Sequence, residues 1–278
     1  MGMRPPWRRR LRPVQRGDAI RLVIHAKAAM DPDLRSAVAS LRTGGHSVEV
    51  RVTWEPGDAE RFAAEAVADA ACGCVVAGGG DGTINAVLGG LLDTTVRPLP
   101  SLAVLPLGTA NDFARACGIP VGDPLAALEL AVKRPAIAVD AGQVNGRCFL
   151  NVATGGFGTD ITVNTPEELK KLLGGAAYLF TGVRHASSIT ARHAVIEGPE
   201  FNWSGGFLAL AVGNGRYAGG GVPMCEGAML DNGRLELSIL PDVTADNIGN
   251  VLSNLLEFGF NAKTLERHVV RARAHEFT

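Results

Sequence analysis

The sequence has 278 residues, of which 46% are hydrophobic and 20% charged, and its net charge at pH 7 is −1. This length suggests two domains, because single domains usually contain about 100–150 residues. The near-neutral charge gives no electrostatic argument for a nucleic-acid partner. There is no run of about 18 apolar residues, so the sequence predicts no transmembrane helix.

Cysteine and histidine patterns give no sign of a metal or redox site. The five cysteines include no C-x-x-C pair, the spacing of Cys72 and Cys74 fits neither a zinc nor a redox motif, and the histidines form no H-E-x-x-H pattern. Buried thiols in a reducing compartment are the favoured interpretation, so we expect a cytoplasmic protein.

Residues 1–17 contain six arginines and no acidic residue. No apolar segment follows them, which argues against a secretory signal. A disordered basic extension is the favoured interpretation. The alternative is a basic arm that contacts anionic lipid headgroups.

Between residues 18 and 134, strand and helix patterns alternate. The expected strands are 20–25, 46–53, 74–77 and 101–105, and the expected helices are 33–43, 58–71 and 83–92. Strands separated by helices predict a parallel sheet covered on both faces. The fold class is therefore α/β, with a doubly wound domain in this half.

The second half, residues 135–278, has a different pattern and is expected to form a β-rich, sandwich-like domain. The expected strands are 136–144, 148–154, 193–196, 206–212 and 234–240, and Asn145-Gly146 is typical of a hairpin turn. Two helices are expected, one beginning at Thr165 and one over about 245–258.

A glycine-rich loop, Gly78-Gly79-Gly80-Asp81-Gly82-Thr83, joins a buried strand to a helix. Glycines allow a backbone to approach phosphate oxygens, and a helix N-terminus adds unpaired N–H groups and a positive dipole end. The loop therefore predicts a triphosphate site in preference to a turn without a ligand. Asp81 is an unexpected acid beside an anion, and it could orient the loop, hold a metal-bound water or contact an acceptor hydroxyl.

A second loop, Leu105–Phe113, also follows a strand and precedes a helix. In an open parallel sheet both loops lie at the carboxyl edge, where ligands bind. Thr109, Asn111 and Asp112 offer polar side chains there, and helix capping is the alternative role for Asn111 and Asp112. Neither loop is a Walker A motif or a dinucleotide fingerprint.

Together these motifs resemble the diacylglycerol kinase catalytic family, and specifically the bacterial YegS-like lipid kinases. The likeness extends over nearly the whole chain and also rests on Arg51–Glu55, Gly57–Ala59, Thr154–Thr159, Thr165–Glu167, Gly213–Arg216 and Gly219–Gly221. It implies two domains with the active site in the cleft between them. It further implies ATP as phosphate donor, Mg²⁺, and transfer of the γ-phosphate to a hydroxyl of a lipid such as phosphatidylglycerol or diacylglycerol.

The resemblance also implies particular site residues. The implied ATP contacts are Thr53, Gly79, Gly80, Asp81, Gly82, Thr83, Ile84, Asn85 and Thr109. The implied metal ligands are the carbonyls of Met229 and Arg234 and the side chain of Asn232, with Asp231 adjacent. Position 232 is Asn where the family has Asp, and Mg²⁺ prefers carboxylate. A weaker site, another divalent cation such as Ca²⁺, and a plain Asn-Gly turn all remain open.

In this family the implied general base is a Glu in a Leu-Asp-Gly-Glu segment. That segment follows the strand that 268–278 resembles, so we expect the base beyond Thr278, with Asp81 as an orienting or metal-linked group only. A nucleotide- or lipid-binding protein without turnover is one alternative. A small-molecule kinase of the NAD-kinase or phosphofructokinase type is another, although the Leu105–Phe113 and Thr154–Thr159 segments argue against it.

The helix expected after Thr165 bears on access to a lipid. It carries Lys170 and Lys171 beside an apolar stretch that runs to Phe180. The pattern fits core packing of an amphipathic helix, and also transient contact with the surface of the inner membrane. The sequence does not define an oligomeric state.

Overall fold

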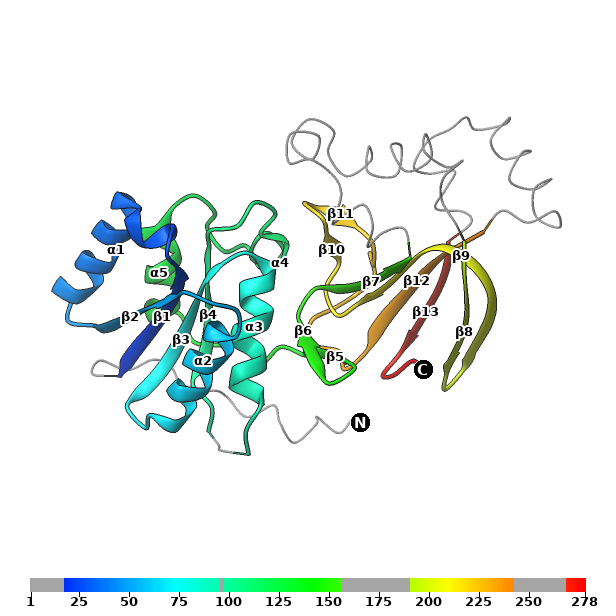
Figure 1. Ribbon diagram of the computed structural model, residues 1–278, viewed down its shortest axis with the longest axis horizontal. Helices are drawn as coiled ribbons and strands as arrows, with labels where there is room; N and C mark the ends of the chain where they lie inside the picture. Colours follow the sequence, from blue (N-terminus) through cyan, green and yellow to red (C-terminus); the bar gives the residue numbers. More distant parts are fainter. Residues whose placement is uncertain (1–17, 96–97, 157–190, 243–268) are drawn as a thin grey trace. The chain divides into compact units, whose positions relative to one another are not determined.

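The computed structural model describes residues 18–95, 98–156, 191–242 and 269–278, and it divides the chain into two compact units, Met1–Leu150 and Asn151–Thr278 (Figure 1). The basic N-terminal segment and both helices expected in the second half lie outside the described residues. Among the helices described, none is long and apolar enough to cross a membrane.

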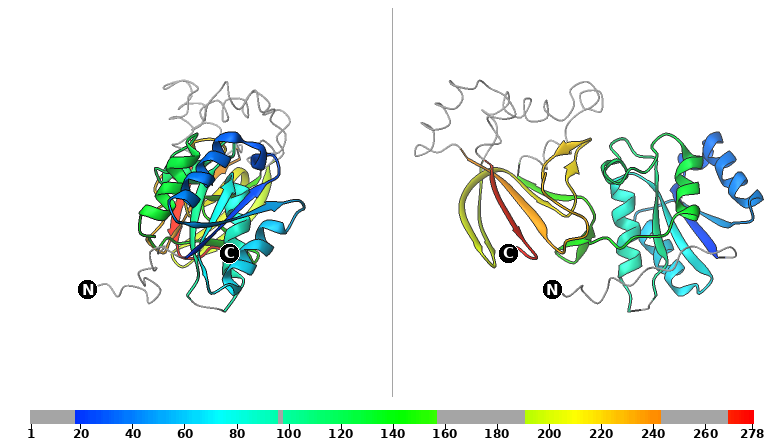
Figure 2. Two further views of the ribbon diagram at one scale, coloured as in Figure 1. Left: turned by 90° about the vertical axis from the view of Figure 1, so that its left-hand side faces the viewer. Right: turned by 180° about the vertical axis from the view of Figure 1, so that it is seen from behind.

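The N-terminal unit contains a four-stranded parallel sheet. Its strands are β1 (Ala19–His25), β2 (Ser47–Thr53), β3 (Cys72–Gly79) and β4 (Ser101–Pro106), and their order is β2-β1-β3-β4. Helices α1 (Pro32–Thr43) and α5 (Pro124–Lys133) pack together on one face, and α2 (Asp58–Ala68) and α3 (Asp81–Leu92) on the other (Figures 1 and 2). This arrangement confirms the predicted doubly wound domain.

Strand periodicity accounts for the core beneath α1. Ile20, Leu22 and Ile24 alternate along β1 and are almost completely buried in one cluster with Leu34 and Val38 of α1. The α1 helix begins after Asp31, whose carboxylate accepts hydrogen bonds from the N–H groups of residues 33 and 34. Such a cap satisfies N–H groups that have no partner within the helix.

The strand order creates a switch point at the carboxyl edge of this sheet. The chain passes from β1 outward to β2 and then crosses to β3 on the other side of β1. Ligands of open α/β sheets bind beyond the carboxyl ends of the strands at such a point. Thr53 ends β2 and Gly79 ends β3 at this edge. The short 3-10 helix η1 (Ala28–Met30) and the loop after β4 begin at the same edge.

The hairpin of β5 (Gly142–Val144) and β6 (Arg147–Phe149) belongs to the N-terminal unit, which extends to Leu150. Asn145 and Gly146 have φ values of 49° and 78°, so the predicted hairpin turn is confirmed. The expected strand 136–144 is formed only at its last three residues. Strand β6 contacts α3, and the division between the two compact units falls after this hairpin.

Five described strands of the C-terminal unit form one antiparallel sheet. These strands are β7 (Val152–Gly156), β8 (Arg192–Gly198), β9 (Phe201–Gly213), β12 (Leu235–Pro241) and β13 (Val270–Ala274), in the order β13-β12-β9-β7 with β8 also paired to β9. Strands β10 (Tyr217–Ala218) and β11 (Val222–Pro223) form a separate pair. The unit is β-rich as predicted, and its described strands supply no second large sheet of a sandwich.

Candidate functional site

The N-terminus of α3 follows directly from the end of β3. Gly80 occupies the N-cap position, where it can offer no capping side chain, and its carbonyl accepts the first helical hydrogen bond from Ile84 N–H at 3.1 Å. The N–H groups of Gly82 and Thr83 precede that bond, in the first turn of the helix, where N–H groups have no partner within the helix itself. This is the geometry of an anion-binding helix terminus.

Glycine occupies the positions of this loop for different physical reasons. A Cβ on Gly79 would lie 2.5 Å from the Cβ of Thr83, and one on Gly80 would lie 3.3 Å from the Cα of Gly108. Packing within the chain therefore requires glycine at position 79 and favours it at position 80. Gly82 is different, because a Cβ there would meet nothing within 4 Å. Its small size is unexplained by the described protein atoms and fits the close approach of a ligand.

Asp81 joins the two predicted loops. Its Oδ2 accepts a hydrogen bond from Asp112 N–H at 3.1 Å, and its Oδ1 accepts one from Phe113 N–H at 3.0 Å. These N–H groups are at the start of the short helix α4 (Asp112–Ala116). Asp81 thus caps a helix that lies about 30 residues away in the chain, which supports the orienting role among the three considered for it.

The second loop is closed by Asn111. Its Oδ1 accepts a hydrogen bond from Gly108 N–H at 2.9 Å, and its Nδ2 donates to the Gly108 carbonyl at 2.7 Å. Asn111 has a φ of 51°, in the left-handed region that Asn tolerates. Its side chain makes no cap hydrogen bond to α4. The expected capping role of Asn111 is therefore replaced by loop closure, and Thr109 stays exposed at the loop.

The end of β2 is fixed by a buried carboxylate. Asp58 is 5% exposed, and its Oδ2 accepts hydrogen bonds from the N–H groups of Trp54 at 2.7 Å and Glu55 at 3.1 Å. Arg61 donates to Oδ1 at 2.6 Å. The Trp54 N–H first, and then Arg61 and the Glu55 N–H, lower the pKa of Asp58 from 3.8 to about 2. The ionised carboxylate holds the backbone immediately after Thr53.

Two implied ATP contacts on α3 have structural roles. Ile84 is 1% exposed, and its N–H donates to Gly80, so neither group is presented to a ligand. Asn85 is partly exposed, and its Oδ1 accepts a hydrogen bond from Leu150 N–H at 3.1 Å. Asn85 therefore ties α3 to the last residue of the N-terminal unit.

The proposed metal ligands lie on an exposed turn before β12. Asn232 Oδ1 accepts a hydrogen bond from Arg234 N–H at 3.0 Å, which closes an Asx-type turn. Met229 and Asp231 are exposed beside it. In the described part of the chain, no three His, Cys, Asp or Glu residues gather as a metal site would require. Mg²⁺ favours carboxylate oxygens over the amide of Asn232, and a metal site at this turn stays a prediction.

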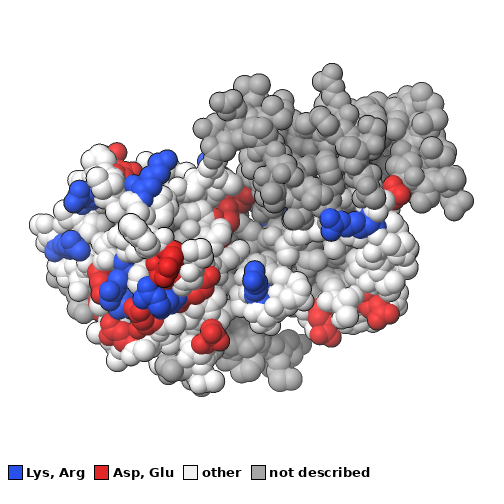
Figure 3. All heavy atoms as spheres, viewed as in Figure 1, with Lys and Arg blue, Asp and Glu red and all other residues white. Residues whose placement is uncertain are grey.

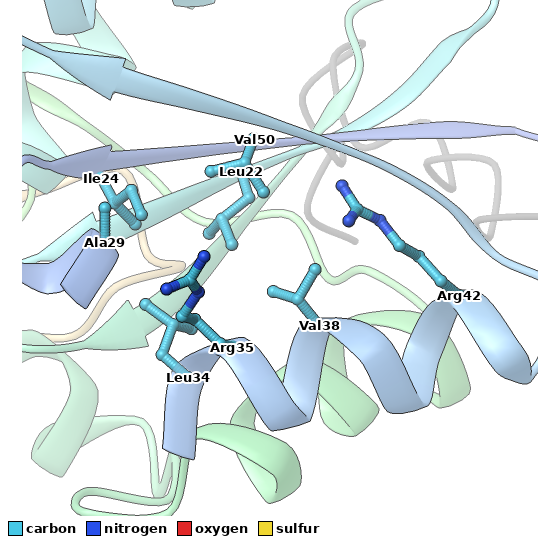
Figure 4. A pocket seen from close by; sticks show the side chains of 8 residues that line it. All are labelled: Leu22, Ile24, Ala29, Leu34, Arg35, Val38, Arg42 and Val50. Carbon is cyan, nitrogen blue, oxygen red and sulfur yellow. The ribbon is translucent and has the colours of Figure 1, made fainter. Parts of the chain in front are cut away.

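A cavity of about 300 Å³ lies between α1 and the sheet (Figure 4). Apolar side chains of β1, β2 and α1 form it, and Arg35 and Arg42 extend from α1 beside it. Arg42 Nη2 donates to the Val48 carbonyl at 2.7 Å. Because no residue of either predicted loop lines the cavity, we place the phosphate site at the start of α3 and not here.

The part of the chain that forms the parallel sheet and both loops matches a known domain family. The family model of the diacylglycerol kinase catalytic domain matches residues 20–144, a range that contains both loops. A Pseudomonas fluorescens protein named "Probable lipid kinase YegS-like" is 48% identical over 252 residues, which cover 91% of this chain and 81% of the relative. The chain belongs to the YegS-like lipid kinase family. A Pseudomonas aeruginosa member is 50% identical over 256 residues, with 92% and 82% covered.

Solved structures agree with this YegS-like fold. A putative diacylglycerol kinase from Bacillus anthracis has a TM-score of 0.74 at 24% identity, and the match covers 95% of this chain and 85% of that one. A second structure from the same organism has a TM-score of 0.71 at 23% identity. At this identity the likeness is one of fold. The family membership confirms the resemblance predicted from the sequence motifs.

Proposed function

We propose that this protein is an ATP-dependent lipid kinase that transfers the γ-phosphate of ATP to a hydroxyl of a lipid, with diacylglycerol or phosphatidylglycerol as the acceptor class. The observation that carries the proposal is the bridge from Asp81 to the N–H groups of Asp112 and Phe113. It holds the two family loops together beside the open N-terminus of α3, where a triphosphate would bind.

The proposed nucleotide contacts follow from this geometry. Backbone N–H groups at 82 and 83 would bind phosphate oxygens, Gly82 would allow their close approach, and Thr83 would add its hydroxyl. Thr109 would contact the phosphates from the second loop, and Thr53 would contact the nucleotide beyond the end of β2. Phosphoryl transfer depends mainly on such placement and on charge stabilisation.

The reaction needs two further groups, one to neutralise the phosphate charge and one to accept the proton of the acceptor hydroxyl. Mg²⁺ bound to ATP would neutralise the developing phosphate charge, and the metal site at 229–234 stays a prediction. The acceptor hydroxyl also needs a general base. Both carboxylate oxygens of Asp81 accept backbone hydrogen bonds, so its proposed role is to position the loops and not to remove that proton.

The proposed setting is the cytoplasmic surface of a membrane. All five cysteines are free, which is usual in a reducing compartment. A lipid acceptor resides in a membrane, so the kinase must contact that surface at least transiently. Binding to vesicles with and without the acceptor lipid would measure this contact.

The test of the proposed function is a competition among acceptors. The protein is incubated with γ-labelled ATP, Mg²⁺ and vesicles that contain diacylglycerol or phosphatidylglycerol, with NAD⁺ and fructose 6-phosphate in the same reaction. Label in the extracted lipid is the expected result. Label in NAD⁺ or the sugar phosphate, with none in lipid, would refute a lipid acceptor.

A further inference from the structure

Trp54 is the most exposed large apolar side chain in the described part of the chain, with 89% of its surface accessible. It follows Thr53 at the end of β2 and lies outside the two glycine loops. An indole this exposed has its ring faces open to a partner. Its backbone, in contrast, is firmly held.

The buried carboxylate of Asp58 fixes the chain at this position. It binds the N–H groups of Trp54 and Glu55, and Arg61 holds its other oxygen. The side chain of Asp58 is nearly inaccessible, whereas the indole beside it is open to solvent. The turn therefore places an aromatic surface at a defined point on the carboxyl edge of the sheet. A backbone that is already fixed favours ligand recognition, because less conformational entropy is lost on binding.

The strand register locates that point relative to the phosphate loop. Thr53 pairs with His25 of β1, and Ile24 pairs with Gly78 of β3, so the ends of β2 and β3 are level on either side of β1. Two strand spacings separate them, about 10 Å. In an adenosine triphosphate, the ribose and the first phosphate separate the base from the outer phosphates by a similar span. A nucleotide with its phosphates at α3 can thus extend over β1 and bring its base to Trp54.

We propose that Trp54 is the aromatic platform on which the base of the nucleotide stacks. Stacking of a base on an aromatic side chain requires a free ring face, which this exposure supplies. The assignment rests on the proposed function for the identity of the nucleotide. It adds a specificity residue that the glycine loop cannot provide, since the loop recognises only phosphate.

Insertion of Trp54 into a membrane is the competing role for an exposed indole. The surroundings disfavour it. Glu55 is exposed directly beside Trp54, and acidic and basic side chains are interspersed on the face of the N-terminal unit that Figure 3 shows. An anionic lipid surface attracts clusters of basic residues, and this mixed surface is not one.

The experiment compares binding of ATP with binding of inorganic tripolyphosphate to the full chain. Trp54→Ala should raise the Kd for ATP by about 5-fold to 100-fold, the range expected for one lost stacking contact. Its Kd for tripolyphosphate, which has no base, should stay that of the wild type. Trp54→Phe should recover most of the ATP affinity, because it restores an aromatic face.

Two controls separate the outcomes. Ile137→Ala removes another exposed apolar side chain, in the segment between α5 and β5, and should change neither Kd. Tryptophan fluorescence quenched by ATP should persist in Trp203→Phe but not in Trp54→Phe. Unchanged ATP affinity in Trp54→Ala would overturn the proposal, as would equal weakening of both ligands or loss of vesicle binding alone. Nucleotide binding is read without lipid turnover, so an absent lipid product would count against the proposed function and leave this test intact.

Discussion

The Oδ1 of Asp81 lies 3.0 Å from the backbone nitrogen of Phe113, so the first residue of α3 caps the helix that follows the next strand. Its Oδ2 accepts a parallel hydrogen bond from residue 112. One side chain therefore sets the spacing of both loops at the carboxyl edge. Loss of this side chain should disturb the stability and the nucleotide site together.

Asp81→Ala should lower the free energy of unfolding by about 1–3 kcal/mol, because two backbone N–H groups lose a charged acceptor. Asp81→Asn keeps one acceptor oxygen and should lose less. Urea unfolding of the wild type and both variants measures these differences, and ATP binding measured on the folded proteins should weaken in the same order. Wild-type stability in Asp81→Ala would contradict the bridging role.

Asp58 should make stability depend on pH in the acidic range. Its pKa is about 2 in the fold and 3.8 otherwise, chiefly because the Trp54 N–H binds its carboxylate. A carboxyl whose pKa is lowered by folding stabilises the fold above the higher value, and that contribution is lost as pH falls through the lower one. Asp58→Asn should therefore be less stable than the wild type near neutral pH, and the difference should shrink from pH 3.8 downward. Unfolding measured across this range gives the test, and a difference that stays constant would argue against it.

Neighbouring glycines in α3 should respond in opposite ways to the same substitution. A Cβ on Gly90 would meet the Glu60 carbonyl and come within 2.9 Å of the Ala63 Cβ, whereas a Cβ on Gly89 would meet nothing within 4 Å. Gly90→Ala should destabilise the protein by about 1–3 kcal/mol through overpacking against α2. Gly89→Ala should stabilise it by about 0.5–1 kcal/mol, because Gly is the weaker helix former. Thermal and urea unfolding of the two variants would settle the contrast, and similar effects from both would refute it.

Local patterns were sufficient to predict the sheet and the first loop. A short apolar run with β-branched residues predicted β1, and alternating valines predicted β2. The glycine run placed the phosphate loop between β3 and α3, and Asn145-Gly146 predicted the hairpin. Helix α5 was missed, although Asp123 and Pro124 form a recognisable start, in which the Asp123 carboxylate accepts from Ala126 N–H at 2.9 Å. The strand expected over 136–144 was too long because alternation alone does not supply a pairing partner.

The contacts that define the site could not be predicted in the same way. The bonds from Asp81 to residues 112 and 113 join positions 31 and 32 apart, and they depend on β4 lying beside β3. The buried clamp of Asp58 and the open space beside Gly82 also exist only once the strands are aligned. Sequence motifs identified the residues, but the division of roles between ligand contact and loop support required the fold.

The central claim is that the N-terminus of α3 holds the phosphates of ATP for transfer to a lipid. The most direct measurement is the rate at which γ-labelled phosphate reaches vesicle lipid, compared among the wild type, Gly82→Ala and Gly89→Ala. Both positions accept a methyl group without a clash in the described protein, so the two variants are matched for folding.

Gly82→Ala should reduce the rate and raise the Kd for ATP by about 10-fold to 100-fold, as expected when a charged hydrogen bond is lost to a methyl group that blocks phosphate. Gly89→Ala should match the wild type in both. Equal rates and affinities for all three proteins would contradict the claim.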